Sequence, residues 1–170
     1  MCREALDIKD IFGILTVEQW LAFLRIAVGL WWLESVRHKD LRRFLQTEMV
    51  SWTLKLADSH RVPAYGRLMR RLIEPNAAWF PYLIVLGELC VGVGLTFGIL
   101  TPVSALVGLF LNLNYLSMAG LPPKDISLNP GYEVEQGQNF MMMAIEIVVF
   151  FVAAGCTWGV DGTLGLFCCR

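Results

Sequence analysis

Histidine is scarce in this chain of 170 residues: there are two, His38 and His60, and neither lies in a long apolar stretch. Their positions argue against a haem held by paired histidines inside a membrane. The cysteines form no C-x-x-C motif and no zinc-ligand spacing, which argues against a quinone reductase that works through a cysteine pair. The sequence also lacks a glycine-rich phosphate loop and a metal-ligand cluster. We therefore expect no tightly bound cofactor and no metal site.

The cysteines that are present suggest packing more than chemistry. Cys90 and Cys156 fall inside apolar stretches and are expected to be small packing residues. For the adjacent pair Cys168 and Cys169 near the end of the chain, acylation, oxidation and no chemical role are open alternatives.

Apolar residues are abundant: hydrophobic types make up 56% of the chain, and the mean hydropathy is +0.55. Four apolar stretches are each about 20 residues long, the length that a helix needs to cross about 30 Å of hydrocarbon. These stretches cover 17–36, 79–97, 101–120 and 139–157. The expected fold is all-α: a single domain over residues 1–170, a polytopic membrane protein built as a four-transmembrane-helix bundle. Residues 1–16 carry too many charges for a cleavable signal peptide and are expected to form a short surface segment.

Basic residues concentrate in the loop after the first stretch, residues 37–75. By the positive-inside rule we expect this loop to be cytoplasmic and both termini to lie on the opposite side, in the inner or cytoplasmic membrane of a bacterium or archaeon. Between Leu41 and Leu56 apolar residues recur at helical spacing, which predicts an amphipathic interfacial helix that ends before Pro63. The same loop could equally dock a partner subunit. Residues 121–137 are expected to form a second cytoplasmic loop.

Each apolar stretch carries a charged or amide residue near its middle. One ionisable group at a bilayer centre costs about 2.5–3.5 kcal/mol, so we expect these groups to meet in a shared polar core. The residues are Arg25, Glu88, Asn112, Asn114 and Glu146. Asn112 and Asn114 lie about 200° apart around a helix, so only one can face the core, and we expect it to be Asn112.

This polar core is the candidate site. One arginine against two glutamates leaves an excess of negative charge, and a buried carboxyl group can relay protons, so Glu88 and Glu146 are the catalytic candidates. The candidates for binding a quinone headgroup or a small anion are Arg25, Asn112, Asn139 and Tyr115. The alternative is an internal ion-pair network that only fixes the register of the helices. Trp31 and Trp32, near the end of the first stretch, are expected to anchor it at the membrane interface.

Four segments together carry a family resemblance. They read LRIAVGLWWLESVRHK (Leu24–Lys39), IEPNAAWFPYLIVLGELCVGVGLTFGILTPVSALVGLFLNLNYLSMAG (Ile73–Gly120), NPG (Asn129–Gly131) and QNFMMMAIEIVVFFVAAGCTWGVDGTLG (Gln138–Gly165). In this order, and over most of the chain, they resemble the DoxX/DoxD superfamily, in particular the DoxD small membrane subunit of thiosulfate:quinone oxidoreductases. One departure is the insertion of Tyr132–Gln138 between NPG and the last helix, which alters the cytoplasmic rim of the expected site.

The resemblance implies a four-helix bundle and, for some members, thiosulfate oxidation coupled to quinone reduction together with a second subunit. Quinone would then be a substrate, and this chain the membrane subunit of an oxidoreductase. An alternative is a non-catalytic accessory subunit of a larger respiratory or photosynthetic membrane complex. A small transporter or lipid-binding protein is a third possibility. All three have the lipid bilayer as a partner, and none involves nucleic acid.

Overall fold

The computed structural model describes residues 15–152 and 154–168, and the regular elements among them are helices, with no strand. The all-α expectation is confirmed. The long helices are α2 (Val17–Arg37), α6 (Phe80–Phe97), α7 (Thr101–Met118) and α8 (Tyr132–Phe151). The shorter elements are α3 (Leu41–Arg43), the π-helical η1 (Phe44–Glu48), α4 (Met49–Asp58), α5 (Pro63–Ile73), η2 (Glu74–Asn76), η3 (Ile126–Leu128), η4 (Ala154–Cys156) and α9 (Val160–Leu164). Residues 1–14, which hold most of the expected surface segment, lie outside the described part.

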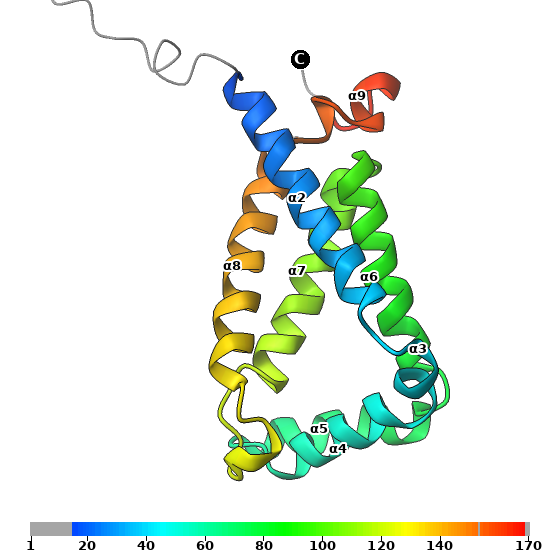
Figure 1. Ribbon diagram of the computed structural model, residues 1–170, viewed down its shortest axis with the longest axis vertical. Coiled ribbons are helices and arrows are strands. Elements are labelled where there is room, and N and C mark those ends of the chain that lie inside the picture. Colours follow the sequence, from blue (N-terminus) through cyan, green and yellow to red (C-terminus); the bar gives the residue numbers. More distant parts are fainter. Residues whose placement is uncertain (1–14, 153, 169–170) are drawn as a thin grey trace, which may run out of the picture.

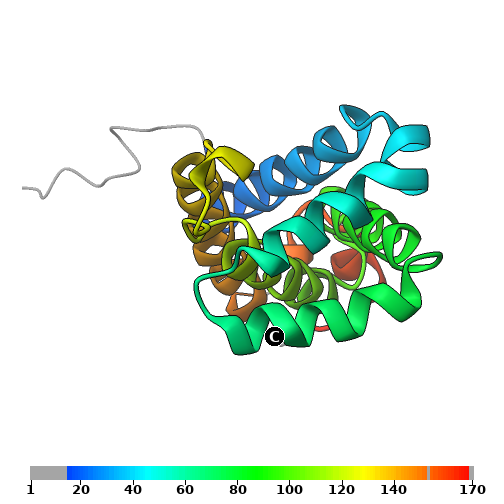
Figure 2. The same cartoon turned by 90° about the horizontal axis from the view of Figure 1, so that it is seen from below.

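The four long helices run along the length of the molecule (Figure 1). The first of them, α2, packs chiefly on α6, and α7 packs on both α6 and α8. The elements α3, η1, α4 and α5, which we call the end layer, lie across one end of the long helices. Seen from below, α4 and α5 pass beneath the long helices (Figure 2). At the opposite end lie α9, the start of α2 and the turn between α6 and α7 (Figure 1).

Local signals explain where the first long helices begin and end. At the start of α2, Thr16 and Gln19 form a capping box: the Thr16 hydroxyl accepts the N–H of Gln19, and the Gln19 side chain accepts the N–H of Thr16 at 2.8 Å. At the end of α6, Gly98 adopts φ +64°, a left-handed conformation that suits glycine. Leu100, just before α7, also has a positive φ of 48°, which is costly for a leucine. This turn therefore needs support from elsewhere in the chain.

The fourth long helix differs from its expected range of 139–157. It begins at Tyr132 and ends at Phe151, so the expected loop 121–137 stops at Gly131 and the inserted segment forms the first turns of α8. The apolar stretch alone gave the wrong start, because the preceding segment is polar yet rich in the good helix formers Glu and Gln. Two of these, Glu133 and Glu135, also lie in the first turn, where a negative charge interacts favourably with the helix dipole.

The predicted helix of the long loop is present as one continuous helical run over residues 41–58, made of α3, the π-helical η1 and α4. Its last part, α4, ends at Asp58, and Pro63 is the first residue of the next helix, α5. The prediction that this helix ends before Pro63 is confirmed. Pro63 also starts α5, because the first turn of a helix does not need the N–H that proline lacks. Gly66 lets α5 cross α4 closely, since a Cβ there would overlap the carbonyl oxygen of Ala57.

Charged side chains lie inside the bundle, and large apolar side chains lie outside it. The buried charged residues are Arg25, Glu88, Glu146 and Asp161. On the outer faces of the long helices, large apolar side chains such as Phe23, Leu83, Leu106, Phe140 and Phe151 are exposed. By length and composition, one helix in the described part of the chain, α6, could cross a membrane. The four-span arrangement stays a prediction.

The cysteines are not placed as expected. Cys156 lies beyond α8 in η4 and forms a disulfide with Cys168, so it is not a small packing residue within a span. The two half-cystines are close because the chain folds back through α9 between them. Cys90 is a free cysteine exposed on α6. The remaining member of the expected vicinal pair, Cys169, lies outside the described residues.

Candidate functional site

A cavity of about 420 Å³ lies among the long helices next to the end layer. Its walls come from the second half of α2, the first halves of α6 and α8, and the second half of α7, and α4 and α5 contribute to its lining. Most of the lining is apolar or aromatic. The polar lining groups include Lys39, Glu88, Asn112, Tyr115 and Asn139. Four of these five were expected to be site residues, and Lys39 was not.

Glu88 is the charged group of α6 that faces this cavity, with 2% of its side chain exposed. One carboxylate oxygen forms an ion pair with the ammonium group of Lys39. The other oxygen accepts a hydrogen bond from the hydroxyl of Tyr115 at 2.7 Å. The Lys39 nitrogen also lies 5.1 Å from the centre of the Phe44 ring, a cation–π distance. Glu88 therefore has a cation and a hydroxyl donor, and both of these partners also line the cavity.

The bend between α2 and α3 places Lys39 over Glu88. The preceding helix, α2, ends at Arg37, and the Asp40 side chain caps α3 by accepting the N–H of Arg43 at 3.3 Å. Lys39 therefore sits in the bend itself, with 22% of its side chain exposed. The sequence analysis counted Lys39 among the basic loop residues and missed this role. Helical spacing could not have indicated it, because α2 ends at Arg37 and Lys39 lies beyond the helix.

Glu146 forms a second cluster beside the first and does not line the cavity. One of its oxygens accepts the indole N–H of Trp32 at 2.9 Å, and the other accepts the amide N–H of Asn112 at 2.9 Å. Gly108 of α7 makes room for this carboxylate, because a Cβ at that position would overlap it. In the described part of the chain Glu146 has no ion-pair partner. The rings of Trp32 and Tyr115, 6.3 Å apart, connect the two clusters.

Trp32 was expected at the membrane interface together with Trp31. The structure separates them: Trp31 is half exposed, whereas Trp32 is buried and holds Glu146. Adjacent helical residues point about 100° apart, and here one tryptophan faces the bundle while the other faces outward.

Arg25 lies toward the other end of the bundle, in a site of its own. Its guanidinium donates to the carbonyl oxygens of Leu95 (2.7 Å), Thr96 (3.4 Å), Thr157 (3.4 Å) and Trp158 (2.9 Å). Asp161, which is also buried, interacts with it electrostatically. Within the described residues, Arg25 forms no ion pair with Glu88 or Glu146. The prediction of one shared polar core was therefore wrong. The polar groups form two clusters near the cavity, around Glu88 and Glu146, and a separate site around Arg25 toward the opposite end.

Three asparagines, Asn112, Asn114 and Asn139, line the cavity. Asn112 is buried and faces inward, as expected. The expectation that only Asn112 of the first two would face the site was wrong, because Asn114 also lines the cavity while its amide donates to the carbonyl oxygen of Phe110 on its own helix. Asn139 is buried, lines the cavity and donates to the carbonyl oxygen of Glu135 at 2.7 Å. Among the described residues, no group of three or more His, Cys, Asp or Glu side chains is placed to hold a metal ion.

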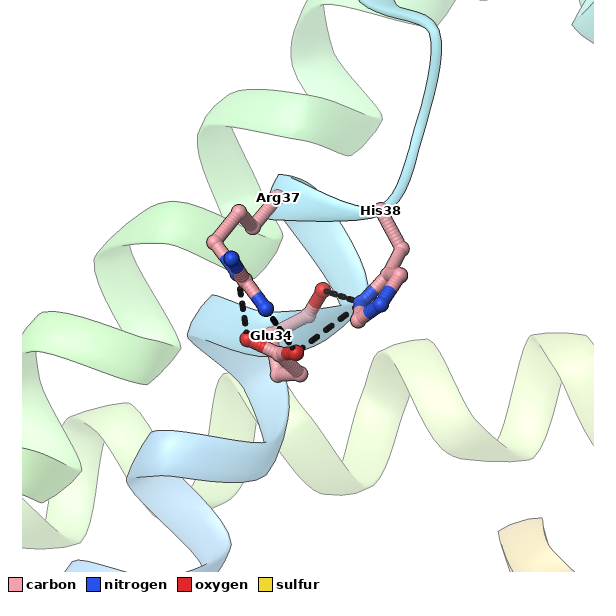
Figure 3. A network of polar contacts seen from close by, with 3 residues as sticks. All are labelled: Glu34, Arg37 and His38. Carbon is pink, nitrogen blue, oxygen red and sulfur yellow. Dashed lines mark hydrogen bonds and ion pairs between the residues drawn. The ribbon is translucent and has the colours of Figure 1, made fainter.

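Glu34, Arg37 and His38 at the end of α2 form a polar cluster at the surface, which serves as a comparison for the buried ones (Figure 3). Glu34 accepts hydrogen bonds from Arg37 at 2.7 and 2.5 Å and lies 3.1 Å from the ring nitrogen of His38. All three side chains are well exposed. This cluster consists of neighbours along one helix and does not line the cavity.

The cavity can therefore hold a molecule with an apolar body and a polar head. The ammonium of Lys39 and the hydroxyl of Tyr115 are donors, and the Glu88 carboxylate is an acceptor. Compared with known proteins, the chain matches no family model, no curated protein and no solved structure.

Proposed function

We propose that this chain is the membrane subunit of a quinone-linked oxidoreductase of the thiosulfate:quinone type, with α2, α6, α7 and α8 as four transmembrane helices. Support for the membrane location comes from charged groups buried between the helices and large apolar side chains exposed outside them. This arrangement is unfavourable in water and favourable in hydrocarbon. The resemblance to the DoxX/DoxD superfamily supports the reaction type.

Two separate features support one orientation in the membrane. The end layer carries several exposed basic residues, including Arg42, Arg43 and Arg67, and such residues favour the cytoplasmic side. The opposite end carries the disulfide between Cys156 and Cys168, and disulfides are typical of oxidising compartments outside the cytosol. We therefore take the end layer as cytoplasmic.

The cavity beside Glu88 is the observation that carries the proposal. Its volume of about 420 Å³ falls in the range of roughly 300–1,000 Å³ that is usual for small-molecule sites. The aromatic residues Trp31, Trp32 and Phe80 contribute apolar wall, and the polar groups gather around one carboxylate. A quinone headgroup is flat, apolar in its ring and hydrogen-bonding at its carbonyl oxygens, so its chemistry fits this lining.

In this function the residues of the chain bind the headgroup and handle protons. Reduction of a quinone to a quinol takes up electrons and protons, and the electrons would come from a partner subunit that oxidises thiosulfate. Lys39 has N–H groups beyond the one that pairs with Glu88 and donates these to a quinone oxygen, while the hydroxyl of Tyr115 turns from Glu88 to the ligand when it donates. Glu88 exchanges protons between these groups and the ligand. Glu146 does not line the cavity, but it accepts hydrogen bonds from Trp32 and Asn112, which do, and so orients them.

A binding titration tests the proposal. The protein is purified in mild detergent, reconstituted in nanodiscs and titrated with a decyl-substituted benzoquinone, while quenching of its tryptophan fluorescence is followed. Lys39→Met removes a charged donor to the quinone oxygens, which only accept, and Glu88→Gln removes the charged acceptor that holds Lys39 and Tyr115 in place. Hydrogen bonds to charged groups are worth about 1.5–3 kcal/mol, so the Kd should rise by about 10- to 100-fold.

The matched control is Glu34→Gln, the same substitution in the exposed cluster of Figure 3, and it should leave the Kd unchanged. Equal affinity in the wild type and in Glu88→Gln would refute the cavity as the quinone site. If no quinone binds, and the protein instead co-purifies with an unrelated large membrane complex, the accessory-subunit alternative is correct.

A further inference from the structure

A second cavity, of about 180 Å³, lies between the end layer and the loop after α7, and a different set of residues lines it from those beside Glu88. Its lining comes from the end of α4, the turn that follows, α5 and the loop after α7. The polar lining side chains are Asp58, His60, Arg67, Arg70 and Lys124. Arginine and lysine are cationic at neutral pH, so we call this cavity the basic pocket.

Specific hydrogen bonds bring these segments of the chain together. The carbonyl oxygen of Ser59 accepts the N–H of Lys124 at 2.8 Å, and the Ser59 hydroxyl accepts the N–H of Asp125 at 3.0 Å. His60, which is 4% exposed, accepts a backbone N–H at one ring nitrogen (3.0 Å) and donates from the other to the carbonyl oxygen of Ser117 at 2.9 Å. The loop after α7 accordingly lies beside the turn between α4 and α5 (Figure 1). The backbone at Lys124 is therefore fixed next to the pocket.

The charges of the basic pocket do not balance. The guanidinium of Arg70 donates to both carboxylate oxygens of Asp58, at 3.1 and 2.6 Å, so the one acidic group of the lining already has a partner. Within the described residues, neither Arg67 nor Lys124 forms an ion pair. Two like charges at one small cavity repel each other, and a bound anion would offset this repulsion.

The donors of the basic pocket suit a phosphate group. The guanidinium of Arg67 is a planar fork that matches two phosphate oxygens, and the ammonium of Lys124 acts as a compact charge. Pro63 and Gly66 place the first turn of α5 in the same lining; in the described chain no side chain caps that turn, so the helix dipole also favours an anion. The volume is below the roughly 300–1,000 Å³ usual for whole small-molecule ligands, and so suits one charged headgroup.

The surface of α5 next to the basic pocket is both apolar and basic. Leu68 and Leu72 are each 50% exposed, and Arg67 and Arg71 beside them are exposed as well. Exposed leucines and arginines on one helix are typical of a helix that lies at the level of the lipid headgroups. Basic pockets at the cytoplasmic face of membrane proteins recognise the phosphates of anionic lipids. Lipid phosphates are therefore one source of the anion.

We propose that the basic pocket binds a phosphate group, held by Arg67 and Lys124, with Arg70 as a third cationic group that Asp58 keeps in place. An anionic lipid of the leaflet next to the end layer and free phosphate present the same oxyanion to these donors. The inference does not depend on quinone binding, because it uses other residues at another cavity.

The test is a titration of the protein in a mild non-ionic detergent, followed by isothermal titration calorimetry. The ligands are dihexanoyl phosphatidylglycerol and inorganic phosphate. Arg67→Ala and Lys124→Ala each remove a charged donor to the phosphate, so the Kd of whichever ligand binds should rise about tenfold. Tighter binding of the phospholipid identifies a lipid headgroup as the source, and tighter binding of inorganic phosphate identifies free phosphate.

Arg71→Ala is the matched control. Arg71 is exposed on the same helix as Arg67 but lies outside the pocket lining, and its replacement removes the same charge. The Kd should therefore not change in this variant. Helical circular dichroism confirms that each variant is folded.

Three results would overturn the inference. If Arg71→Ala weakens binding as much as Arg67→Ala does, the ligand responds to the net charge of the surface and not to the pocket. If neither ligand binds the wild-type protein, the pocket is no phosphate site. If Arg67→Ala and Lys124→Ala leave both Kd values unchanged but abolish co-purification of another protein, the pocket is a docking surface for that protein.

Discussion

Replacing Asp161 should destabilise the protein strongly, because this one side chain caps the start of α7 from a distant part of the chain. Its two carboxylate oxygens accept the N–H groups of Leu100 at 2.8 Å and Thr101 at 2.7 Å. Asp161 is 1% exposed, so its loss leaves both N–H groups without an acceptor. The hydrogen bond of Thr101 is buried and that of Leu100 is partly buried. An orphaned buried N–H costs about 1–3 kcal/mol and a partly buried one costs less, so the two together should cost about 3 kcal/mol. Asp161→Asn keeps one acceptor and should lose about half of that.

The free energy of unfolding can be measured by SDS titration in detergent micelles, with loss of helical circular dichroism as the signal. Asp125→Ala is the matched control, because Asp125 also caps a helix by accepting the N–H of Ser127 at 3.0 Å but is exposed. Loss of a solvent-exposed cap of this kind should lower the free energy of unfolding by about 1 kcal/mol or less. If Asp161→Ala loses no more stability than Asp125→Ala, water or another group satisfies the start of α7, and the reasoning is wrong.

Two further predictions use the same unfolding measurement. Leu100→Gly should stabilise the protein by about 0.5–1 kcal/mol, because it removes the cost of a left-handed leucine at a half-exposed position; a loss of stability would contradict this. Glu146→Ala should cost about 2–5 kcal/mol by leaving Trp32 and Asn112 without an acceptor, whereas Glu146→Gln should cost far less, because the Asn112 amide can turn over and accept from the new amide group. Equal losses in the two Glu146 variants would show that the negative charge itself is required.

The long helices could be predicted from the sequence because each combines an apolar stretch with local end signals. The capping box at Thr16 and the glycine at position 98 are such signals. The start of α8 was misplaced because hydropathy marks where a helix becomes apolar, and the polar segment from Tyr132 has its own helix propensity. The all-helical class was therefore predictable, but one boundary was not.

The candidate site was less predictable, because it depends on how antiparallel helices align in depth. Arg25 and Glu88 each lie near the middle of an apolar stretch, yet they belong to different ends of the bundle. The ion-pair partner of Glu88 is instead Lys39, from a bend whose path follows from the capping of α3. The partners of Asp161 could not be predicted either, because they lie about 60 residues earlier in the chain and no local pattern indicates them.

The distribution of acceptors around Arg25 has a consequence for how the protein is made. Leu95 and Thr96 belong to the end of α6, whereas Thr157 and Trp158 follow α8 and lie 132 and 133 residues after Arg25. While a nascent chain is still shorter than this, one of the two terminal nitrogens of the guanidinium has no carbonyl partner. The surroundings of Arg25 in the first long helix are thus completed only after α8 has been made. A chain cut short just before Thr157 would keep every long helix and still carry a half-satisfied charge in its interior, a defect that a quality-control protease could recognise.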